Sequence, residues 1–479
     1  MVDTVENAPV TGDGWSATLA LAPATFRATV GALRATGARP VAVLDALCFG
    51  RPDAPALSDA VARLGGHGNG VDLPNVGGLV VLDPVFTGTP LVATACVGVR
   101  PEGEGPGTTA ASDPVPERPS ARPSWIDPLN GRRAEDLPRA ASGGELGEQV
   151  LRLVGSPALG DRGWVTEQYD SRAGGNTVLA RPEGAGMVRV DEGGRGVAAA
   201  LTTNPRFGLL NPYLGAQLAL GSAHRRVAAT GARPVAAAQC VAVGSPDDRA
   251  VMWQYRESVL GLVDGCLALD TPSADTTTSF GHHADGANIH PTAVAGVVGV
   301  VDDVAVALSM GFAHPGDAVV LLGRTREELS GSAWAEVVHR HLGGMPPMPH
   351  LAAEKALAGV LLTAATRGLL SSALAVAEGG LAAALALGSL RHGLGVSLTL
   401  PAGDPTLHLF AESAARAVVS VSAAHYGQLR ALCRAAGVPL ERLGEVVEAP
   451  ELEVLGQFTL PLDEVRARWE APLREVLDR

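Results

Sequence analysis

A seven-residue segment occurs twice in this chain. Residues 36–42 and residues 230–236 both read TGARPVA, so the two copies lie 194 positions apart. A helix-like segment precedes each copy, and an apolar run of strand length follows each one, VAVLDALCFG after the first and VAAAQCVAVG after the second. The repeat therefore predicts two related αβ units. Such a pair favours a pseudo-twofold arrangement in which the strands of the two units pair.

The composition indicates a folded, acidic protein. The 479 residues carry a net charge of −13, and 46% of them are hydrophobic. Nucleic-acid surfaces need clustered Lys and Arg, so we expect no nucleic-acid partner. The five cysteines are scattered without a CxxC pair, which is typical of a reducing compartment. The chain shows no signal peptide and no stretch of the about 18 apolar residues that a membrane helix needs, so we expect a cytoplasmic protein without membrane contact.

Changes in composition along the chain predict its organisation. A Pro/Gly-rich, linker-like stretch separates the two copies of the repeat, and a third segment with alternating helix-like and strand-like runs follows the second copy. The predicted parts are an N-terminal extension (1–24), a first, shortened unit (25–100), the linker (101–146), a second unit (147–314), a C-terminal companion domain (315–460) and a C-terminal helix (461–479).

Several long motifs follow one another in a characteristic order. They include NPRFGLLNPYLGAQLAL (204–220), HPTAVAGVVGVVDD (290–303), LLGRTREELSGSAW (321–334), AEGGLA (377–382) and FAESAARAVV (410–419). Together they resemble the later half of formylglycinamidine ribonucleotide synthase. The resemblance implies an α+β fold in which two units like the N-terminal domain of aminoimidazole ribonucleotide synthetase pair into a central barrel-like sheet. One C-terminal α+β companion domain would accompany them.

The family uses ATP to convert an amide into an amidine, and the resemblance implies acidic and amide ligands for Mg²⁺. Many of these positions differ here. The expected ligands fall on Ala32, Ser222, Arg226 and Gln239, and the GGN segment falls on Asp275, Thr276 and Thr277, while Glu378 keeps one carboxylate in the AEGG segment. We therefore expect that the standard Mg-ATP site is lost. Arg226 would then neutralise Glu378 or hold a phosphate without a metal.

The candidate site residues follow from this comparison and from residue chemistry. Glu378 and the imidazoles of His282 and His283, in the loop SFGHHADGANIH, are the candidate acid-base groups. Solvated histidines and an Arg226 that only caps a helix remain the structural alternatives. We assign no metal ligand. The candidate ligand-binding residues are Arg226, Asp275, Thr277, Asn204, Arg206, Gly331, Ser332 and Asn69.

Three functions remain open from the sequence. The favoured hypothesis is a divergent member of the family that binds a phosphorylated or nucleotide-like ligand, or a partner subunit, without turnover. The first alternative is an active ATP-dependent amide-to-amidine ligase, which would need ATP and Mg²⁺. The second is a different enzyme class that uses Glu378 and the histidine loop. The resemblance implies a subdomain between the two halves of the family, and the Pro/Gly-rich linker stands in its place here. This replacement suggests a homodimer or a complex with a related subunit.

Overall fold

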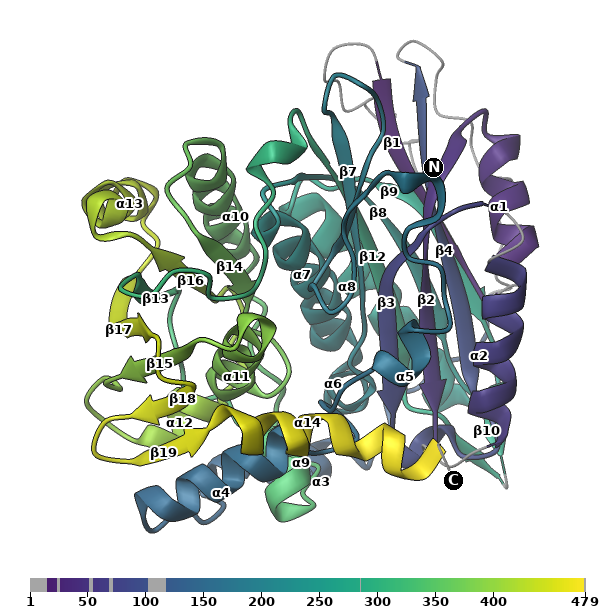
Figure 1. The fold of residues 1–479 in the computed structure, drawn as a ribbon. Coiled ribbons are helices and arrows are strands. Elements are labelled where there is room, and N and C mark those ends of the chain that lie inside the picture. The colour runs from purple at the N-terminus through teal and green to yellow at the C-terminus, as the bar shows by residue number, and fades with distance from the viewer. Residues whose placement is uncertain are drawn as a thin grey trace.

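The computed structural model describes residues 15–23, 26–50, 55–68, 72–101, 118–284 and 286–477. The fold is α+β and has two parts, which lie side by side in Figure 1. One part is a barrel-like core of two facing sheets, and the other is a companion domain built on a third sheet. Helix α14 (Leu462–Leu477) runs along one end of both parts.

The first sheet belongs to the first copy of the repeat. Its strand order is β1-β4-β2-β3, and β2 runs parallel to β3 and antiparallel to β4. Apolar residues such as Leu33 of helix α1 and Leu57 of helix α2 pack on its outer face. The elements are β1 (Trp15–Ala22), α1 (Phe26–Ala35), β2 (Arg39–Phe49), α2 (Pro55–Gly68), β3 (Asn75–Leu82) and β4 (Leu91–Pro101).

The second sheet repeats the first. Its order is β5-β6-β7-β12-β8-β9, and the last four strands have the order and the directions of β1-β4-β2-β3. Even the irregularity in the parallel pair recurs, between Val43 and Leu44 in one unit and between Ala237 and Ala238 in the other. The prediction of two related units is confirmed. The strands are β5 (Thr177–Leu179), β6 (Gly186–Arg189), β7 (Gly196–Thr202), β8 (Arg233–Ala242), β9 (Ser273–Ser279) and β12 (Thr292–Val301).

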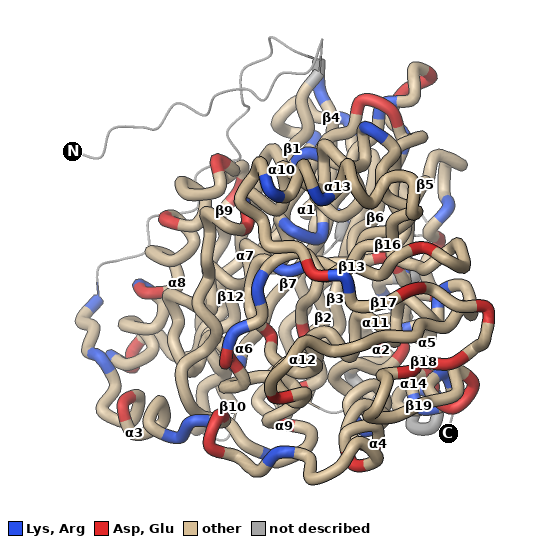
Figure 2. The backbone as a smooth tube through the Cα atoms, turned by 90° about the vertical axis from the view of Figure 1, so that its left-hand side faces the viewer, with Lys and Arg blue, Asp and Glu red and all other residues tan. Residues whose placement is uncertain are grey.

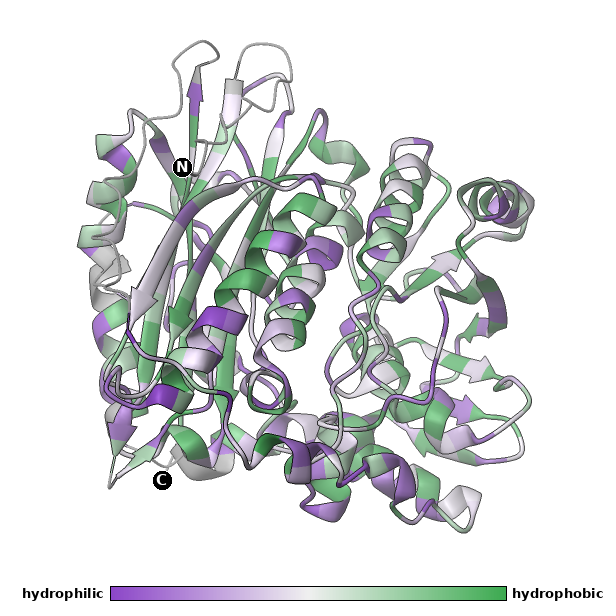
Figure 3. Cartoon of the chain, turned by 180° about the vertical axis from the view of Figure 1, so that it is seen from behind, coloured by the Kyte–Doolittle hydropathy of each residue, from purple (hydrophilic) through white to green (hydrophobic). Residues whose placement is uncertain are grey.

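Helices α6 (Pro205–Leu210), α7 (Pro212–Ala229) and α8 (Arg249–Ala268) belong to the same unit and lie between its strands in the sequence. Helix α7 begins at Pro212, and the side chain of Asn211 caps it by accepting a hydrogen bond from the Leu214 N–H. Helix α7 is buried along most of its length because it lies between the second sheet and the companion domain (Figure 1). In Figure 3 the strands behind these helices are largely apolar.

The inner faces of the two sheets share one apolar core. Leu19, Leu44 and Val97 from the first sheet pack with Val197 and Val294 from the second. Polar contacts also join β1 to β9 at the edge of the two sheets, so the core is closed on this side. Asp275 Oδ2 accepts a hydrogen bond from the Leu21 N–H at 3.0 Å, and Thr277 Oγ1 donates to the Leu21 carbonyl at 3.0 Å. The expected barrel-like pairing of the units is confirmed.

The companion domain is a seven-stranded sheet with helices around it. The strand order is β14-β16-β13-β17-β15-β18-β19. Its strands are β13 (Ala318–Leu322), β14 (Ser372–Ala375), β15 (Gly395–Leu398), β16 (Ala417–Val421), β17 (Leu440–Val447), β18 (Glu451–Val454) and β19 (Phe458–Pro461), and its helices are α9 (Ala333–His339), α10 (Leu351–Thr366), α11 (Gly380–His392), α12 (Pro405–Phe410) and α13 (Ala423–Ala436).

The segment between the units also contributes structure. Residues 118–146, in the range predicted as a linker, include α3 (Ile126–Asn130) and the start of α4 (Gly143–Val154). Apolar residues of α4, such as Val150, pack into the core of the companion domain. Strand β1 likewise begins inside the range assigned to the N-terminal extension. The domain boundaries themselves stay predictions. In the part of the chain that the structure describes, no helix is both long enough and apolar enough to cross a membrane.

Candidate functional site

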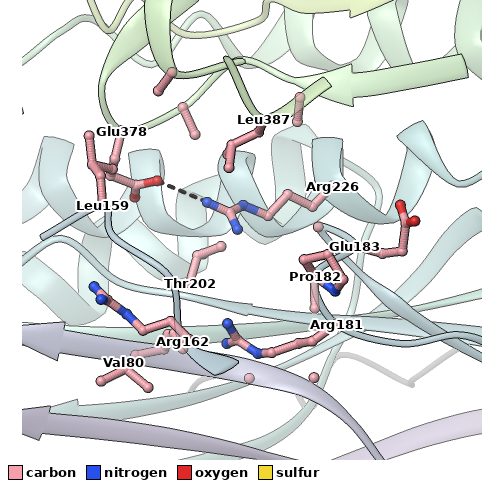
Figure 4. A pocket seen from close by; sticks show the side chains of 18 of the residues that line it. Val80, Leu159, Arg162, Arg181, Pro182, Glu183, Thr202, Arg226, Glu378 and Leu387 are labelled. Atoms are coloured by element: carbon pink, nitrogen blue, oxygen red, sulfur yellow. Dashed lines mark hydrogen bonds and ion pairs between the residues drawn. The ribbon is translucent and has the colours of Figure 1, made fainter. Parts of the chain in front are cut away.

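A cavity of about 550 Å³ lies where the two parts of the molecule meet. Its walls come from β3 of the first unit, from the second unit near α7, from helix α11 of the companion domain and from helix α14. Figure 4 shows the cavity with Arg162, Arg181, Arg226 and Glu378 around it. Ligand sites form preferentially at such domain interfaces. This cavity is therefore the candidate functional site.

Arg226 and Glu378 face each other across the domain boundary. Arg226 lies in the last turn of α7, and its Nη2 donates to Glu378 Oε2 at 2.8 Å. Both side chains are partly exposed to the cavity, at 26% and 30%. The structure thus brings together the arginine and the carboxylate that the sequence singled out. Their roles in binding and catalysis stay predictions.

Two glycines place Glu378 in this position. Gly379 and Gly380 both have positive φ, at 80° and 65°, a conformation that glycine adopts without steric cost. A Cβ on Gly380 would also lie 2.6 Å from the Leu409 carbonyl oxygen, so the turn leaves no room for a larger residue. Behind the turn, Glu412 Oε1 accepts hydrogen bonds from the N–H groups of Gly379 and Ala333, both at 2.8 Å. Burial raises the pKa of Glu412 to about 7.

Asn204 and Arg206 also line the cavity. The side chain of Asn204 caps α6 by accepting from the Phe207 N–H at 3.2 Å, and Arg206 forms an ion pair with Glu336. Both side chains therefore have a structural role at the cavity wall. Their role in ligand binding stays a prediction.

The predicted histidine loop lies elsewhere. His282 and His283 belong to the short hairpin of β10 (His283–Ala284) and β11 (Ala287–Asn288), and neither lines the cavity. His282 Nε2 is 2.7 Å from Ser279 Oγ, and burial lowers its pKa, while His283 is exposed. The structure does not bring these imidazoles together with Glu378. Asp275 and Thr277 are likewise away from the cavity, at the contact between β9 and β1.

The predicted ligand-binding residues Gly331 and Ser332 lie outside the cavity wall. Ser332 is buried and caps α9 by accepting from the Ala335 N–H at 3.2 Å, so this hydroxyl is already used. Gly331 before it has a φ of 72°, and a Cβ there would lie 2.7 Å from the Leu210 side chain. Asn69 lies outside the described residues. The structure therefore gives Gly331 and Ser332 a place beside the cavity residue Ala333 and outside the cavity wall.

Sequence reasoning missed further arginines of the cavity wall, among them Arg162 and Arg181. Arg162 lies in the segment between α4 and α5 (Gly163–Thr166), and Arg181 follows β5. Burial lowers the pKa of each guanidinium to about 10, and the positive charge of Arg226 contributes at Arg181. Both groups remain protonated at neutral pH. Neither residue is part of a motif, so no signal in the sequence pointed to them.

A buried ion pair lies behind the cavity. Arg225, the neighbour of Arg226, pairs with Glu354 of α10, and their side chains are only 5% and 2% exposed. Arg225 Nη2 also donates to the Val376 carbonyl at 3.0 Å, and Glu354 Oε1 accepts from the Ala415 N–H at 2.9 Å. This network fixes α7 against the companion domain. It thereby sets the distance across which Arg226 and Glu378 meet.

A metal ion in the cavity would need free ligands on its wall. Mg²⁺ prefers oxygen ligands, above all free carboxylates. The Glu378 carboxylate is held by Arg226, and across the described residues no group of three or more His, Cys, Asp or Glu is placed to hold a metal ion. The cavity residues thus do not fit a Mg²⁺ ligand set, and we route no chemical step through this ion.

Comparisons with known proteins identify the relatives of the chain. The family models that match are the AIR synthase related protein N-terminal domain, over residues 24–100 and 182–301, and its C-terminal domain, over residues 314–457. The chain is 51% identical over 369 residues to phosphoribosylformylglycinamidine synthase subunit PurL of Cutibacterium acnes, and 47% identical over 374 residues to that of Streptomyces coelicolor. These alignments cover 77% and 78% of this chain. The chain spans about half the length of these curated relatives, 49% and 50%.

Solved structures agree on the fold. Thermotoga maritima PurL complexed with AMPPCP matches with a TM-score of 0.60 and 16% identity, over 91% of both chains. The same protein complexed with FGAR matches with a TM-score of 0.60, over 92% of this chain and 91% of that one, and the PurLQS structure matches with 0.59, over 91% and 90%. At this identity the likeness establishes the fold alone.

These findings correct the favoured functional hypothesis. The expectation that the chain is an inactive relative without a Mg-ATP site is wrong, because proteins about half identical to it over most of its length are named as synthase subunits. The residues at the expected Mg²⁺ ligand positions differ from the general family pattern, but these differences do not indicate a lost activity. The matches to both domain models, the repeated units and the companion domain lead to one conclusion. The chain belongs to the AIR synthase related protein family and resembles the PurL subunit within it.

Proposed function

We propose that this chain acts in ATP-dependent formation of a C–N bond, as a synthase subunit that converts the amide of FGAR into an amidine. The observation that carries the proposal is its identity of 46–51% with PurL subunits over 369–374 residues. The fold supports it, since solved structures of the same fold are complexes of PurL with ATP and with FGAR. The proposed cofactor is ATP, which enters as its Mg²⁺ complex, and we assign no residue of the interdomain cavity as a ligand of that ion. The proposed location is the cytoplasm.

The interdomain cavity supports a role in binding a phosphorylated ligand. Guanidinium groups donate paired hydrogen bonds to phosphate oxygens, and Arg162, Arg181 and Arg226 all face this cavity. Asn204 lies on the same wall and offers an amide for orientation. Glu378 pairs with Arg226, and an anionic ligand would compete with this carboxylate for the arginine. Ligand binding would therefore break the ion pair. The histidine loop is not included, because it does not line the cavity.

The proposal includes partner subunits. One structure of the same fold is titled PurLQS, which denotes an assembly. We propose that this chain works in a complex with further subunits or with a second copy of itself. Figure 2 shows acidic and basic residues interspersed along the chain on one side of the molecule, so a partner there would meet charges of both signs.

The decisive experiment measures release of ADP by the full chain, with ATP, Mg²⁺, FGAR and ammonium as the nitrogen donor. We expect ADP release that depends on both FGAR and ammonium, with the amidine as the second product. Glu378→Gln is expected to reduce the rate, while Glu441→Gln, an exposed carboxylate of β17, should leave it unchanged. ATP hydrolysis that ignores FGAR, or no turnover at all with a second copy or partner subunits present, would contradict the proposal.

A further inference from the structure

Helix α8 carries an apolar stripe on its outer face. Among the described residues, seven large hydrophobic side chains are exposed, and three of them belong to this helix. They are Leu260, Val263 and Leu267, which are 48%, 50% and 65% exposed. Because three and four positions separate them, they lie on one face of the helix. Single exposed hydrophobic residues are ordinary on protein surfaces, but a row of three on one helix is typical of an interaction site.

The opposite face of α8 fixes this orientation. A Cβ on Gly261 would lie 2.3 Å from the Tyr213 carbonyl oxygen, so α8 approaches helix α7 closely at this point. Further along the helix, the Cys266 Sγ accepts a hydrogen bond from Gln239 Nε2 of the second sheet at 3.1 Å. Figure 2 shows α8 at the edge of the molecule, beside α7. The helix therefore cannot rotate to bury its apolar stripe within its own chain.

A charged residue continues the stripe at each end. Arg256 lies one turn before the stripe, and Asp270 lies one turn after it, just past the end of the helix. Arg256 donates to Ser120 Oγ at 3.1 Å, and within the described part of the chain it forms no salt bridge. Asp270 pairs with Lys355, but its side chain remains 71% exposed. Both charges are therefore accessible to a partner.

These residues form a row in which spacings of four and three positions alternate. We call this row the α8 seam, and its residues are Arg256, Leu260, Val263, Leu267 and Asp270. Two helices of a coiled coil pack through residues at this spacing. An antiparallel second copy would place Arg256 against Asp270 of that copy and Leu260 against its Leu267, with the two Val263 side chains at the centre. A parallel copy would bring like charges together at both ends. The seam is thus complementary to itself in the antiparallel orientation.

We propose that the α8 seam is an interface between two copies of this chain, which pack their α8 helices antiparallel about Val263. The proposal rests on the part of the proposed function in which a second copy or further subunits join the chain, and it names the surface that a second copy uses. Three partly exposed apolar side chains per copy make a small interface, and small interfaces bind weakly. We therefore expect reversible association, with a dissociation constant of roughly 10–100 µM.

Sedimentation velocity of the full chain over about 1–200 µM, a range that brackets this dissociation constant, tests the interface. Leu267→Glu puts a carboxylate among the apolar side chains and should weaken association by about tenfold or more. Leu455→Glu is the control, because this residue is 52% exposed in the turn between β18 and β19, and this variant should associate like the parent protein. Both positions are exposed, so both variants should keep the melting temperature of the parent. A parent protein that stays monomeric throughout, or equal association of the two variants, would refute the interface.

An exchange of charges tests the antiparallel orientation. Arg256→Asp and Asp270→Arg each place like charges together at both ends of the seam. Each variant alone should therefore associate about three- to tenfold more weakly than the parent protein. An equimolar mixture restores opposite charges at both ends and should associate like the parent, which only a contact between copies explains. A mixture that associates no more tightly than the separate variants would refute the antiparallel pairing.

The assay of ADP release separates this proposal from the proposed ligase activity. A protein that stays monomeric but releases ADP in response to FGAR would refute the α8 seam as an interface and leave the ligase proposal intact. A dimer that Leu267→Glu disrupts, without ADP release even when partner subunits are present, would support the interface and contradict the ligase proposal.

Discussion

Replacing Glu412 with glutamine tests how burial controls this part of the molecule. Glu412 is 6% exposed, and one oxygen accepts hydrogen bonds from the N–H groups of Gly379 and Ala333. The other oxygen has no hydrogen-bond partner. Burial raises the pKa of this carboxyl from 4.5 to about 7. The folded protein therefore binds a proton at Glu412 over a pH range in which the unfolded chain has lost it.

The sign and size of the effect follow from this difference. Because the folded-state pKa is the higher one, the stabilising contribution is complete below about pH 4.5 and is lost as the pH rises to about 7. The difference of about 2.5 between the folded and unfolded pKa values of Glu412 corresponds to about 3 kcal/mol of unfolding free energy. Glutamine stays neutral and keeps an oxygen for the two N–H groups. The Glu412→Gln variant should therefore lack this part of the pH dependence.

Urea unfolding at pH 5 and pH 8 measures the effect. We expect the parent protein to lose about 2.5 kcal/mol more stability between these pH values than Glu412→Gln does, with all other titrating groups cancelling in the comparison. Glu441→Gln, an exposed carboxylate of the same domain, is the control and should follow the parent protein. Parallel pH profiles for Glu412→Gln and the parent protein would refute the reasoning, since they would mean that Glu412 is ionised at pH 5 in the folded state.

Two further substitutions test the packing around the cavity. Arg225→Met leaves Glu354 buried without its cation, so urea unfolding should show that the free energy of unfolding falls by about 3–5 kcal/mol. The double variant with Glu354→Leu should recover most of this loss. An unchanged unfolding midpoint for Arg225→Met would contradict the buried pair. Gly208→Ala would place a Cβ 2.1 Å from the Pro291 carbonyl oxygen and should lower the melting temperature by several degrees, whereas Gly359→Ala, with nothing within 4 Å, should leave it unchanged or raise it slightly. Equal melting temperatures for these two variants would count against the close approach.

Much of the fold followed from the repeat. Seven identical residues with matching flanks implied two related αβ units. The structure has two such units, with one strand order and the same irregularity in the parallel pairs of β2 and β8. The helix-like and strand-like runs of the third segment also predicted an α+β companion domain. The repeat did not predict the conformation of residues 118–175, because short irregular segments take their conformation from the elements against which they pack.

The site was only partly predictable. The AEGG turn and the end of α7 lie in motifs, so Arg226 and Glu378 were singled out, and the structure places them in contact. Arg162 and Arg181 lie in irregular segments whose direction depends on the whole fold. The histidine loop lies outside the cavity, and its place could not be predicted, because a high density of polar residues does not indicate which surface of the fold they occupy. Differences at expected ligand positions misled it again, since relatives about half identical to the chain carry the synthase name.

The contact between Leu21 and Asp275 has a consequence for how the protein is made. These residues are 254 positions apart, yet they close the same apolar core. A ribosome that adds about 5–20 residues per second needs roughly 13–50 s to produce the second residue after the first. Throughout that time β9 and β12 of the second sheet do not yet exist, so the inner face of the first sheet is at most partly covered. Nascent chains of this protein should therefore depend on chaperones that shield an unfinished sheet, and should aggregate when synthesis stalls between the two units.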